Sequence, residues 1–477
     1  MYSDYDESLR ASQDDQATDR GNLSRATDSL RRYLSAGATG ARSDHSAGFS
    51  IGARVFAVAL IYFSDIILAR WMGQREFGVY VYVWTCLLLL SDLLPLGLAA
   101  AAERFIPEYT RYKMFQHLRG FIFGSRWLVF ALASLVALAC AVLIQTFPSW
   151  FNHYAVIPLY LACAALPFAA LTNLLDGIAR AYNLERIVPI PLSVVRPLLF
   201  LLLVVEANAF GAPADAVTAM TAAVAAIWAT AIIQLLLIDR QLDPALGEGG
   251  KCIDVRGWLR VSFPIAVVGG FYTLMAYTDI LLLQWLQPAE DVALYYAASK
   301  TMMLAALVYV AVDAAIAHRF RDRSISDNPA ELGRFMRDAS QWTFWPSVAG
   351  VIVVLLLGIP MLWLFGSDFT AGYPLMFILA VGLLARAWIG PAERLLTMLG
   401  NARACGFVYA VAFIANAGTC LVLIPQIGAA GAAFGMTTAL ITEGALLFAL
   451  MRRRLGIPLF GNAFRMPRLD SLTGNDP

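Results

Sequence analysis

Charged residues are scarce in this chain. Of its 477 residues only 14% are Asp, Glu, Lys or Arg, whereas 59% are apolar, and the mean hydropathy is +0.65. Soluble domains carry about 25% charged residues, so the composition argues against a soluble enzyme. The 35 cationic and 34 anionic residues nearly cancel. This balance argues against nucleic acid as the main partner, because proteins that bind it are usually strongly basic.

Residue types that carry chemistry are also rare. Lysine occurs only at Lys113, Lys251 and Lys300, and the four histidines are isolated. No phosphate-binding G-x-x-x-x-G-K-[ST] is present, and no H-E-x-x-H, G-x-S-x-G or G-x-G-x-x-G. We therefore expect no cofactor, no metal site, no ATP hydrolysis and no enzyme activity. The cysteines lack paired or metal-type spacing and are predicted to be small buried residues: Cys86, Cys140, Cys163, Cys252, Cys405 and Cys420.

Long apolar runs are what the chain has instead. Crossing the hydrocarbon layer takes about 20 mostly apolar residues as a helix, and runs of this length are too long for barrel strands. The sequence therefore predicts an all-α integral membrane protein with about 12 transmembrane helices. The predicted spans are 49–70, 77–102, 120–146, 155–179, 187–208, 215–238, 258–286, 291–317, 341–365, 373–399, 405–425 and 429–450.

Two polar tails and one polar connection frame these spans. Residues 1–47 are rich in Asp, Ser and Arg and are predicted to be a disordered cytoplasmic tail; the alternative is a short amphipathic stretch on the membrane around Leu23, Leu30 and Leu34. Residues 239–257 contain a Gly-rich stretch and are predicted to link an N-terminal six-helix lobe (48–238) to a C-terminal one (258–452). Residues 453–477 form a second cytoplasmic tail.

The distribution of Arg and Lys predicts the orientation. Both tails and alternate loops are rich in Arg, whereas the opposite set of loops offers only Arg75, with Arg70 at its edge. Because Lys and Arg concentrate on the cytoplasmic side, both termini are predicted to be cytoplasmic, with an even number of spans in the cell inner membrane.

The chain also resembles itself weakly at a shift of about 214 residues. Asp65, Trp71 and Glu76 fall on Asp279, Trp285 and Glu290. Six spans per half give both halves the same orientation, and transporters built from such repeats bind substrate between the halves. Asp65 and Asp279 suit either a shared structural role or an outer gate.

Cations inside spans are functional candidates, because an ionisable group there is costly unless it faces a polar cavity or a partner. Arg196, Lys300 and Arg386 lie well inside their spans, and Arg126 and Arg260 lie nearer the cytoplasmic end. If they converge, they form a chamber suited to phosphate groups. There are two alternatives. Each cation is paired with a nearby carboxylate, such as Asp313 on the span of Lys300 or Glu393 two turns after Arg386, or its side chain reaches the membrane interface.

Carboxylates and prolines inside spans add two further expectations. Asp92 and Glu443 lie deep in their spans and are the candidates for binding a coupling proton or sodium ion. Prolines such as Pro95, Pro197 and Pro391 are predicted to permit kinks.

Residues 66–109 resemble the opening of the polysaccharide exporter and lipid-linked oligosaccharide flippase family, within the multidrug/oligosaccharidyl-lipid/polysaccharide exporter superfamily. An aliphatic-Ala-Arg helix end is followed by a turn from Gly73 to Gly78 and by a span that ends near Arg104-Phe105, and residues 423–435 resemble a later Gly-Ala-Ala turn. The resemblance implies two six-helix lobes around a central cavity. It also implies a polyprenyl-pyrophosphate-linked oligosaccharide as the substrate, with Arg196, Lys300 and Arg386 as the basic residues of the cavity.

The sequence thus predicts a flippase for lipid-linked oligosaccharides in polysaccharide or lipopolysaccharide biosynthesis. Its expected partners are the lipid-linked substrate, membrane lipid, and a polymerase and glycosyltransferases of the same pathway. Two alternatives stay open. One is a drug/cation antiporter of the same superfamily, which would need a cavity dominated by carboxylates, and the other is a membrane polysaccharide polymerase or glycosyltransferase, for which the outward loops are short.

Overall fold

The computed structural model describes residues 40–150, 152–182, 194–246, 249–322, 329–390, 392–398 and 401–455. The chain forms two compact units, Met1–Phe56 and Ala57–Pro477. Only the start of one helix is described in the first unit, so the contacts below belong to the second. The predictions for residues 1–39, including the stretch around Leu23, Leu30 and Leu34, and for residues 456–477 lie outside the described residues.

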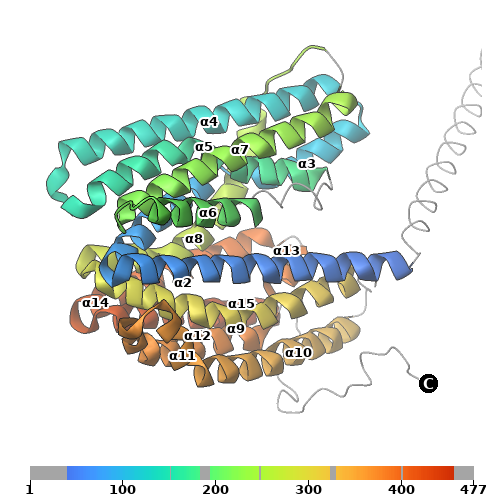
Figure 1. The fold of residues 1–477 in the computed structure, drawn as a ribbon. Helices are drawn as coiled ribbons and strands as arrows, with labels where there is room; N and C mark the ends of the chain where they lie inside the picture. Colours follow the sequence, from blue (N-terminus) through green and yellow to red (C-terminus); the bar gives the residue numbers. More distant parts are fainter. Residues whose placement is uncertain are drawn as a thin grey trace, which may run out of the picture. The chain divides into compact units, whose positions relative to one another are not determined.

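The described residues are helical, with short turns between the helices (Figure 1). In chain order the elements are α2 (Gly40–Leu93), α3 (Leu98–Arg111), α4 (Phe115–Thr146), η1 (Pro148–Trp150), η2 (His153–Ala155), α5 (Val156–Ala181), α6 (Arg196–Ala209), α7 (Ala216–Leu246), α8 (Val255–Leu286), α9 (Ala289–Asp322), α10 (Pro329–Leu356), α11 (Gly358–Phe365), η4 (Ser367–Gly372), α12 (Tyr373–Ile389), α13 (Ala392–Met398), α14 (Ala402–Ile427) and α15 (Ala429–Leu455).

The all-helical membrane architecture is confirmed. Each predicted span coincides with one or two helices over its described residues. Nine helical segments of the described chain are long and apolar enough to cross a membrane, so the predicted count of 12 is not itself confirmed. Two of the predicted spans fall in one of these segments, Phe56–Arg111, and α6 and α9 are not among the nine.

The long helix α2 reverses direction at Gly73. This residue has a left-handed backbone (φ 77°, ψ 174°) inside an otherwise helical segment. The rings of Tyr62 and Phe77 lie 5.4 and 6.4 Å from the ring of Phe365, whereas 15 residues of straight helix span about 22 Å. The two parts of α2 therefore form a hairpin; the predicted span 49–70 ends before the bend at Gly73 and the predicted span 77–102 begins after it. We call this side of the bundle the Gly73 end.

Prolines break two of the predicted spans. Residues 94–97 form a turn between α2 and α3, in which Leu96 and Gly97 have positive φ. Pro95 accounts for the break because its nitrogen has no hydrogen to donate and its ring clashes with the preceding turn. The second break follows α12, where Gly390 (φ 64°) precedes Pro391. By contrast, α5, α8 and α10 continue through Pro167, Pro264 and Pro346.

Helices α3–α7 pack mainly against one another, and so do α8–α15 (Figure 1). Helix α3 joins the two groups by packing on α8, where the Cα of Gly97 approaches so closely that a Cβ atom would lie 2.4 Å from the Ser262 carbonyl oxygen. Helix α2 also contacts both groups. Its Trp71 donates a hydrogen bond to Asn208 of α6 (2.9 Å), and its Arg70 donates to the carbonyl oxygens of Leu364 (2.6 Å) and Trp363 (2.9 Å).

The cysteines only partly follow the prediction of burial. All six have free thiols; Cys405 and Cys420 are buried, and the other four are partly buried. Among the described residues no group of three or more His, Cys, Asp or Glu is placed to hold a metal ion.

Candidate functional site

Arg196 lies at the start of α6 and faces α5. Its Nη2 donates a hydrogen bond to Thr172 Oγ1 (3.0 Å), and its Nε is buried without a partner. Among the described residues no carboxylate lies within ion-pair distance of this guanidinium. Arg196 is partly buried, and a cation shielded from water is costly without a counterion, which makes Arg196 the predicted site residue with the clearest capacity for an anionic ligand.

Lys300 lies in α9 beside two residues that join α9 to α2. Its Nζ is 5.0 Å from the ring centroid of Tyr296, and its charge attracts Asp65. Tyr296 donates a hydrogen bond to Asp65 (3.3 Å), and Tyr62 is hydrogen-bonded to Thr301 one turn away (3.1 Å). Lys300 thus faces a carboxylate from α2. The side chain of Asp313, its predicted partner, lies outside the described residues.

Asp279, which the internal repeat matches to Asp65, has a similar environment. Both carboxylates are buried, with 3% and 7% exposure. Asp279 accepts hydrogen bonds from Tyr295 and from the backbone N–H of Ile280. Two adjacent tyrosines of α9 therefore bind the two repeat-related carboxylates, Tyr295 within the α8–α15 group and Tyr296 across to α2.

Arg386 of α12 is paired with carboxylates. Its Nη2 lies 3.5 Å from Glu443 Oε1 and 3.8 Å from Glu393 Oε2. Glu443 is 1% exposed, and its second oxygen has no hydrogen-bond partner. The sequence alternative, in which Glu393 neutralises Arg386, is therefore observed, and Glu443, predicted as an ion-coupling residue, joins the same cluster.

Arg126 and Arg260, the two cations predicted to lie nearer the cytoplasmic end of their spans, have different environments. Arg126 of α4 donates to Asp239 of α7 through Nη1 (2.6 Å). Arg260 of α8 is exposed. Asp92, the other predicted coupling residue, is exposed on α2 and accepts a hydrogen bond from Asn173 of α5 (2.8 Å).

No hydrogen bond, ion pair or ring contact links Arg196, Lys300 and Arg386 to one another among the described residues. Arg196 and Lys300 instead have partners that the sequence did not predict: Thr172 for Arg196, and Tyr296 with Asp65 for Lys300. The spacing of Tyr296 and Lys300 on one helix face was the available signal. The contact between Arg196 and Thr172 had no signal, because it depends on how α5 and α6 both pack against α7.

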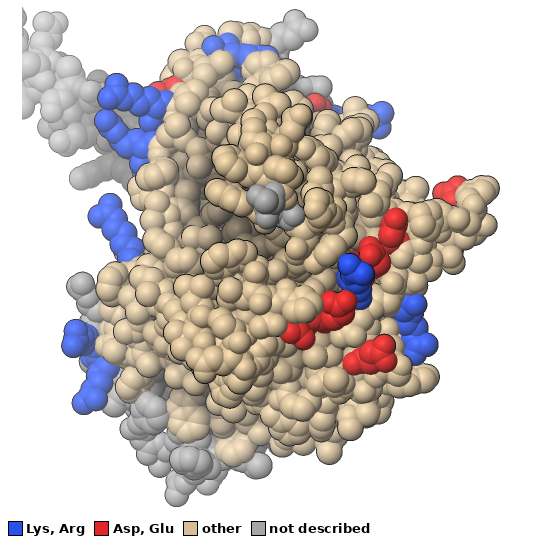
Figure 2. Space-filling model, turned by 90° about the vertical axis from the view of Figure 1, so that its left-hand side faces the viewer, with Lys and Arg blue, Asp and Glu red and all other residues tan. Residues whose placement is uncertain are grey.

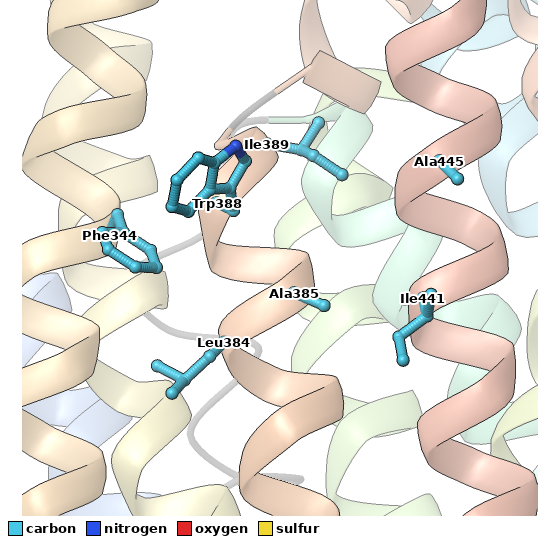
Figure 3. A pocket seen from close by; sticks show the side chains of 7 residues that line it. All are labelled: Phe344, Leu384, Ala385, Trp388, Ile389, Ile441 and Ala445. Atoms are coloured by element: carbon cyan, nitrogen blue, oxygen red, sulfur yellow. The ribbon is translucent and has the colours of Figure 1, made fainter. Parts of the chain in front are cut away.

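An apolar groove of about 410 Å³ lies on α12 between α10 and α15 (Figure 3). Figure 3 shows Phe344 of α10 close to Trp388 and Leu384, and Ile441 and Ala445 on the facing side of α15. All seven lining residues are apolar or aromatic, including Ala385 and Ile389. No charged side chain lines the groove, so it is not the predicted cationic chamber.

Comparisons with known proteins place the chain in a family. The family model described as "Polysaccharide biosynthesis protein" matches residues 47–316, more than half of the chain. A comparison with curated proteins found no match.

Solved structures with the same fold share little sequence with the chain. An inward-facing multidrug resistance MATE family transporter of the MOP superfamily is 15% identical (TM-score 0.67; 85% of this chain and 98% of that one covered). The lipid II flippase MurJ in an inward closed conformation is 14% identical (TM-score 0.66; 84% and 86%). A MOP superfamily transporter from Pyrococcus furiosus is 15% identical (TM-score 0.59; 85% and 93%).

These matches confirm the family resemblance of residues 66–109. They also agree with the observed bundle of apolar helices, in which α2 contacts both helix groups. The chain is a multi-pass membrane protein that belongs to the polysaccharide biosynthesis protein family and has the fold of the MOP superfamily transporters.

Proposed function

We propose that the protein is a flippase that moves a polyprenyl-pyrophosphate-linked oligosaccharide across the cell inner membrane for polysaccharide or lipopolysaccharide biosynthesis. It acts without catalysing a reaction of its own. A polymerase and glycosyltransferases of the same pathway are its proposed partners, and both termini are proposed to be cytoplasmic. The face at the Gly73 end shows few Lys or Arg side chains away from its rim in Figure 2, although several Asp or Glu side chains lie on it, and this scarcity of cations supports the proposed orientation.

The observation that carries the proposal is the state of Arg196. A guanidinium at this position has one hydroxyl partner, an unpartnered buried Nε and no carboxylate within ion-pair distance among the described residues. An anionic group of the substrate would supply the missing counterion, and a pyrophosphate matches the forked donors of arginine. A cationic cargo would add to the electrostatic cost instead.

Lys300 and Arg386 are the other proposed cations of the chamber. Each already faces a carboxylate, Asp65 for Lys300 and Glu443 for Arg386. A pyrophosphate that approaches either cation therefore competes with a protein carboxylate. Such competition keeps the empty chamber electrically balanced and makes substrate binding reversible.

The proposed lobes are α2 with the α3–α7 group, and the α8–α15 group, with boundaries at 48–238 and 258–452. Alternating access by rocking of the lobes requires contacts between them that can open. The hydrogen bonds of Tyr296 with Asp65 and of Tyr62 with Thr301 join α2 to α9 and are suited to this role. Asp92 and Glu443 remain the proposed sites for a coupling ion.

The test is reconstitution of the purified chain in vesicles that carry a polyprenyl-pyrophosphate oligosaccharide in one leaflet. Appearance of the oligosaccharide in the other leaflet is followed with a membrane-impermeant glycosidase. Arg196→Gln should reduce the rate at least tenfold, while Arg104→Gln, which changes an exposed arginine (68% side-chain exposure), should not. Equal rates for the wild type and Arg196→Gln, at equal amounts of folded protein, would contradict the proposal.

A drug/cation antiporter is the second candidate, and the buried carboxylates Asp65 and Asp279 favour it. Fold does not decide between the two, because the MATE transporter and MurJ match about equally well. The discriminating measurement is uptake of an organic cation by the same vesicles under a proton or sodium gradient. Cation uptake that Asp65→Asn abolishes, without oligosaccharide movement, would establish the antiporter.

A further inference from the structure

Two side chains of the α3–α7 group that lie near each other, Arg126 of α4 and Tyr182 at the end of α5, have buried polar atoms without partners. Twelve such side-chain atoms occur among the described residues. Five of them belong to α4, to α7 and to Tyr182 at the end of α5: Ser125 Oγ, Arg126 Nε and Nη2, Tyr182 Oη and Gln234 Nε2. Such atoms are costly in an apolar interior, and the two unpartnered nitrogens of the cationic Arg126 favour an anionic ligand.

Arg126 has a vacant donor edge. Its Nη1 donates to Asp239 Oδ1 (2.6 Å), which fixes the guanidinium. Its Nε and Nη2 have no partner and are shielded from solvent. These two nitrogens form the side of the guanidinium that presents parallel N–H donors, the arrangement that binds two oxygens of one phosphate or carboxylate.

Tyr182 and Asp239 complete the site. Burial raises the pKa of the Tyr182 hydroxyl to about 12, and the nearby positive charge of Arg126 opposes this rise, so the hydroxyl is a donor at neutral pH. The side chain of Asp239 is 49% exposed, whereas that of Arg126 is 15% exposed. The cluster therefore borders the surface of the group at Asp239 and is closed behind Arg126.

The site lies apart from the contact between the two helix groups. On α4, Gly124 packs against Trp258 at the start of α8, so that a Cβ atom there would lie 2.9 Å from the indole. Arg126 follows two residues later and is turned about 200° around the helix axis from Gly124, given 3.6 residues per turn. Arg126 thus faces α5 and α7, on the side away from α8.

We propose that Arg126, with Tyr182, binds the phosphate of an anionic phospholipid between α4, α5 and α7, at a site separate from the transport chamber. A basic pocket between membrane helices near one end of the bundle is typical of headgroup binding. A free phosphate ion has the same chemistry, and the experiment below separates the two sources. The proposal does not depend on the cargo that the protein carries.

The experiment uses the full-length chain, purified and delipidated, with phosphatidylglycerol, diacylglycerol and inorganic phosphate as the probes. Binding of each is measured by native mass spectrometry and by the shift in melting temperature. Phosphatidylglycerol should bind and stabilise the wild type, and diacylglycerol should not. Arg126→Gln should weaken phosphatidylglycerol binding about tenfold or more, because hydrogen bonds to charged groups are lost, and Arg126→Lys should lose most of this affinity since it lacks the fork.

Two further variants serve as controls for a loss of lipid binding that is caused by misfolding. Asp239→Asn keeps an oxygen that can accept from Arg126 Nη1 but removes the negative charge that repels a phosphate, and it should strengthen phosphatidylglycerol binding severalfold. Arg104→Gln removes an exposed cation and should leave binding unchanged. Inorganic phosphate that saturates the wild type but not Arg126→Gln, with no competing effect of phosphatidylglycerol, would identify the source as free phosphate and overturn the lipid assignment. Equal phosphatidylglycerol binding by the wild type and Arg126→Gln would overturn the site itself.

Discussion

Tyr296 of α9 donates a 3.3 Å hydrogen bond to Asp65 of α2, across 231 positions of sequence. Its neighbour Tyr295 binds Asp279, the residue that the internal repeat matches to Asp65. The side chains of adjacent residues on a helix point in directions about 100° apart around its axis. Because of this difference in direction, the bond between Tyr295 and Asp279 stays within the α8–α15 group, whereas the bond between Tyr296 and Asp65 joins that group to α2.

Tyr296→Phe tests the bond across the groups. The variant leaves the buried Asp65 with one donor fewer, and it should lower the free energy of unfolding by about 1–3 kcal/mol. Thermal unfolding of the purified protein in detergent measures the change. Tyr160→Phe is the matched control, because Tyr160 is 37% exposed. This variant should have the melting temperature of the wild type. A melting temperature of Tyr296→Phe equal to that of the control would show that the bond contributes nothing.

Thr172→Val tests the positioning of Arg196. The hydroxyl of Thr172 is the acceptor for Arg196 Nη2, and valine has nearly the same shape. Oligosaccharide transport should fall several-fold, whereas the melting temperature should change little. The control is Thr230→Val, since Thr230 is equally buried and its hydroxyl binds only the backbone of its own helix. If both variants transport alike, Thr172 does not position Arg196.

The Arg386 cluster should respond asymmetrically to substitution. Arg386→Gln leaves Glu443 buried beside no cation, and breaking a buried pair in this way costs about 3–5 kcal/mol. Glu443→Gln should cost less, because Arg386 is 24% exposed and keeps Glu393. The double variant should be more stable than Arg386→Gln alone. A double-mutant cycle by thermal unfolding checks this order, and additive effects would contradict the coupling of the two residues.

Gly97→Ala should disrupt the packing of α3 on α8. Gly97 has φ +74°, and an added Cβ atom would lie 2.4 Å from the Ser262 carbonyl oxygen. Gly211 is a matched control because it has φ +76° and no neighbour within 4 Å of a Cβ atom. Gly211→Ala should cost only the left-handed strain, about 1–2 kcal/mol. Gly97→Ala should lower the melting temperature clearly further, and an equal loss for both would mean that α3 can move away from α8.

The sequence by itself determined the solvent in which this protein folds and the class of its structure. Runs of about 20 apolar residues leave helices as the only way to satisfy the backbone in lipid, so each predicted span matched helical residues. Proline chemistry is also local, and the breaks at Pro95 and before Pro391 follow from it. The resemblance of residues 66–109 likewise predicted a turn from Gly73 to Gly78; in the structure the break lies at Gly73, and residues 74–78 are helical.

Only the tertiary structure decided which charges are partnered. Glu393 lies close to Arg386 in sequence and was a foreseeable partner, but Glu443 reaches it from α15, 57 positions later. Thr172 and Arg196 meet because α5 and α6 both pack on α7, and Asp239 reaches Arg126 from α7. The cost of a buried charge depends on its neighbours in space, and helix packing sets those neighbours. Sequence therefore identified the ionisable residues inside the spans, whereas the fold alone separated Arg196, which has no carboxylate within ion-pair distance among the described residues, from the cations that the protein itself neutralises.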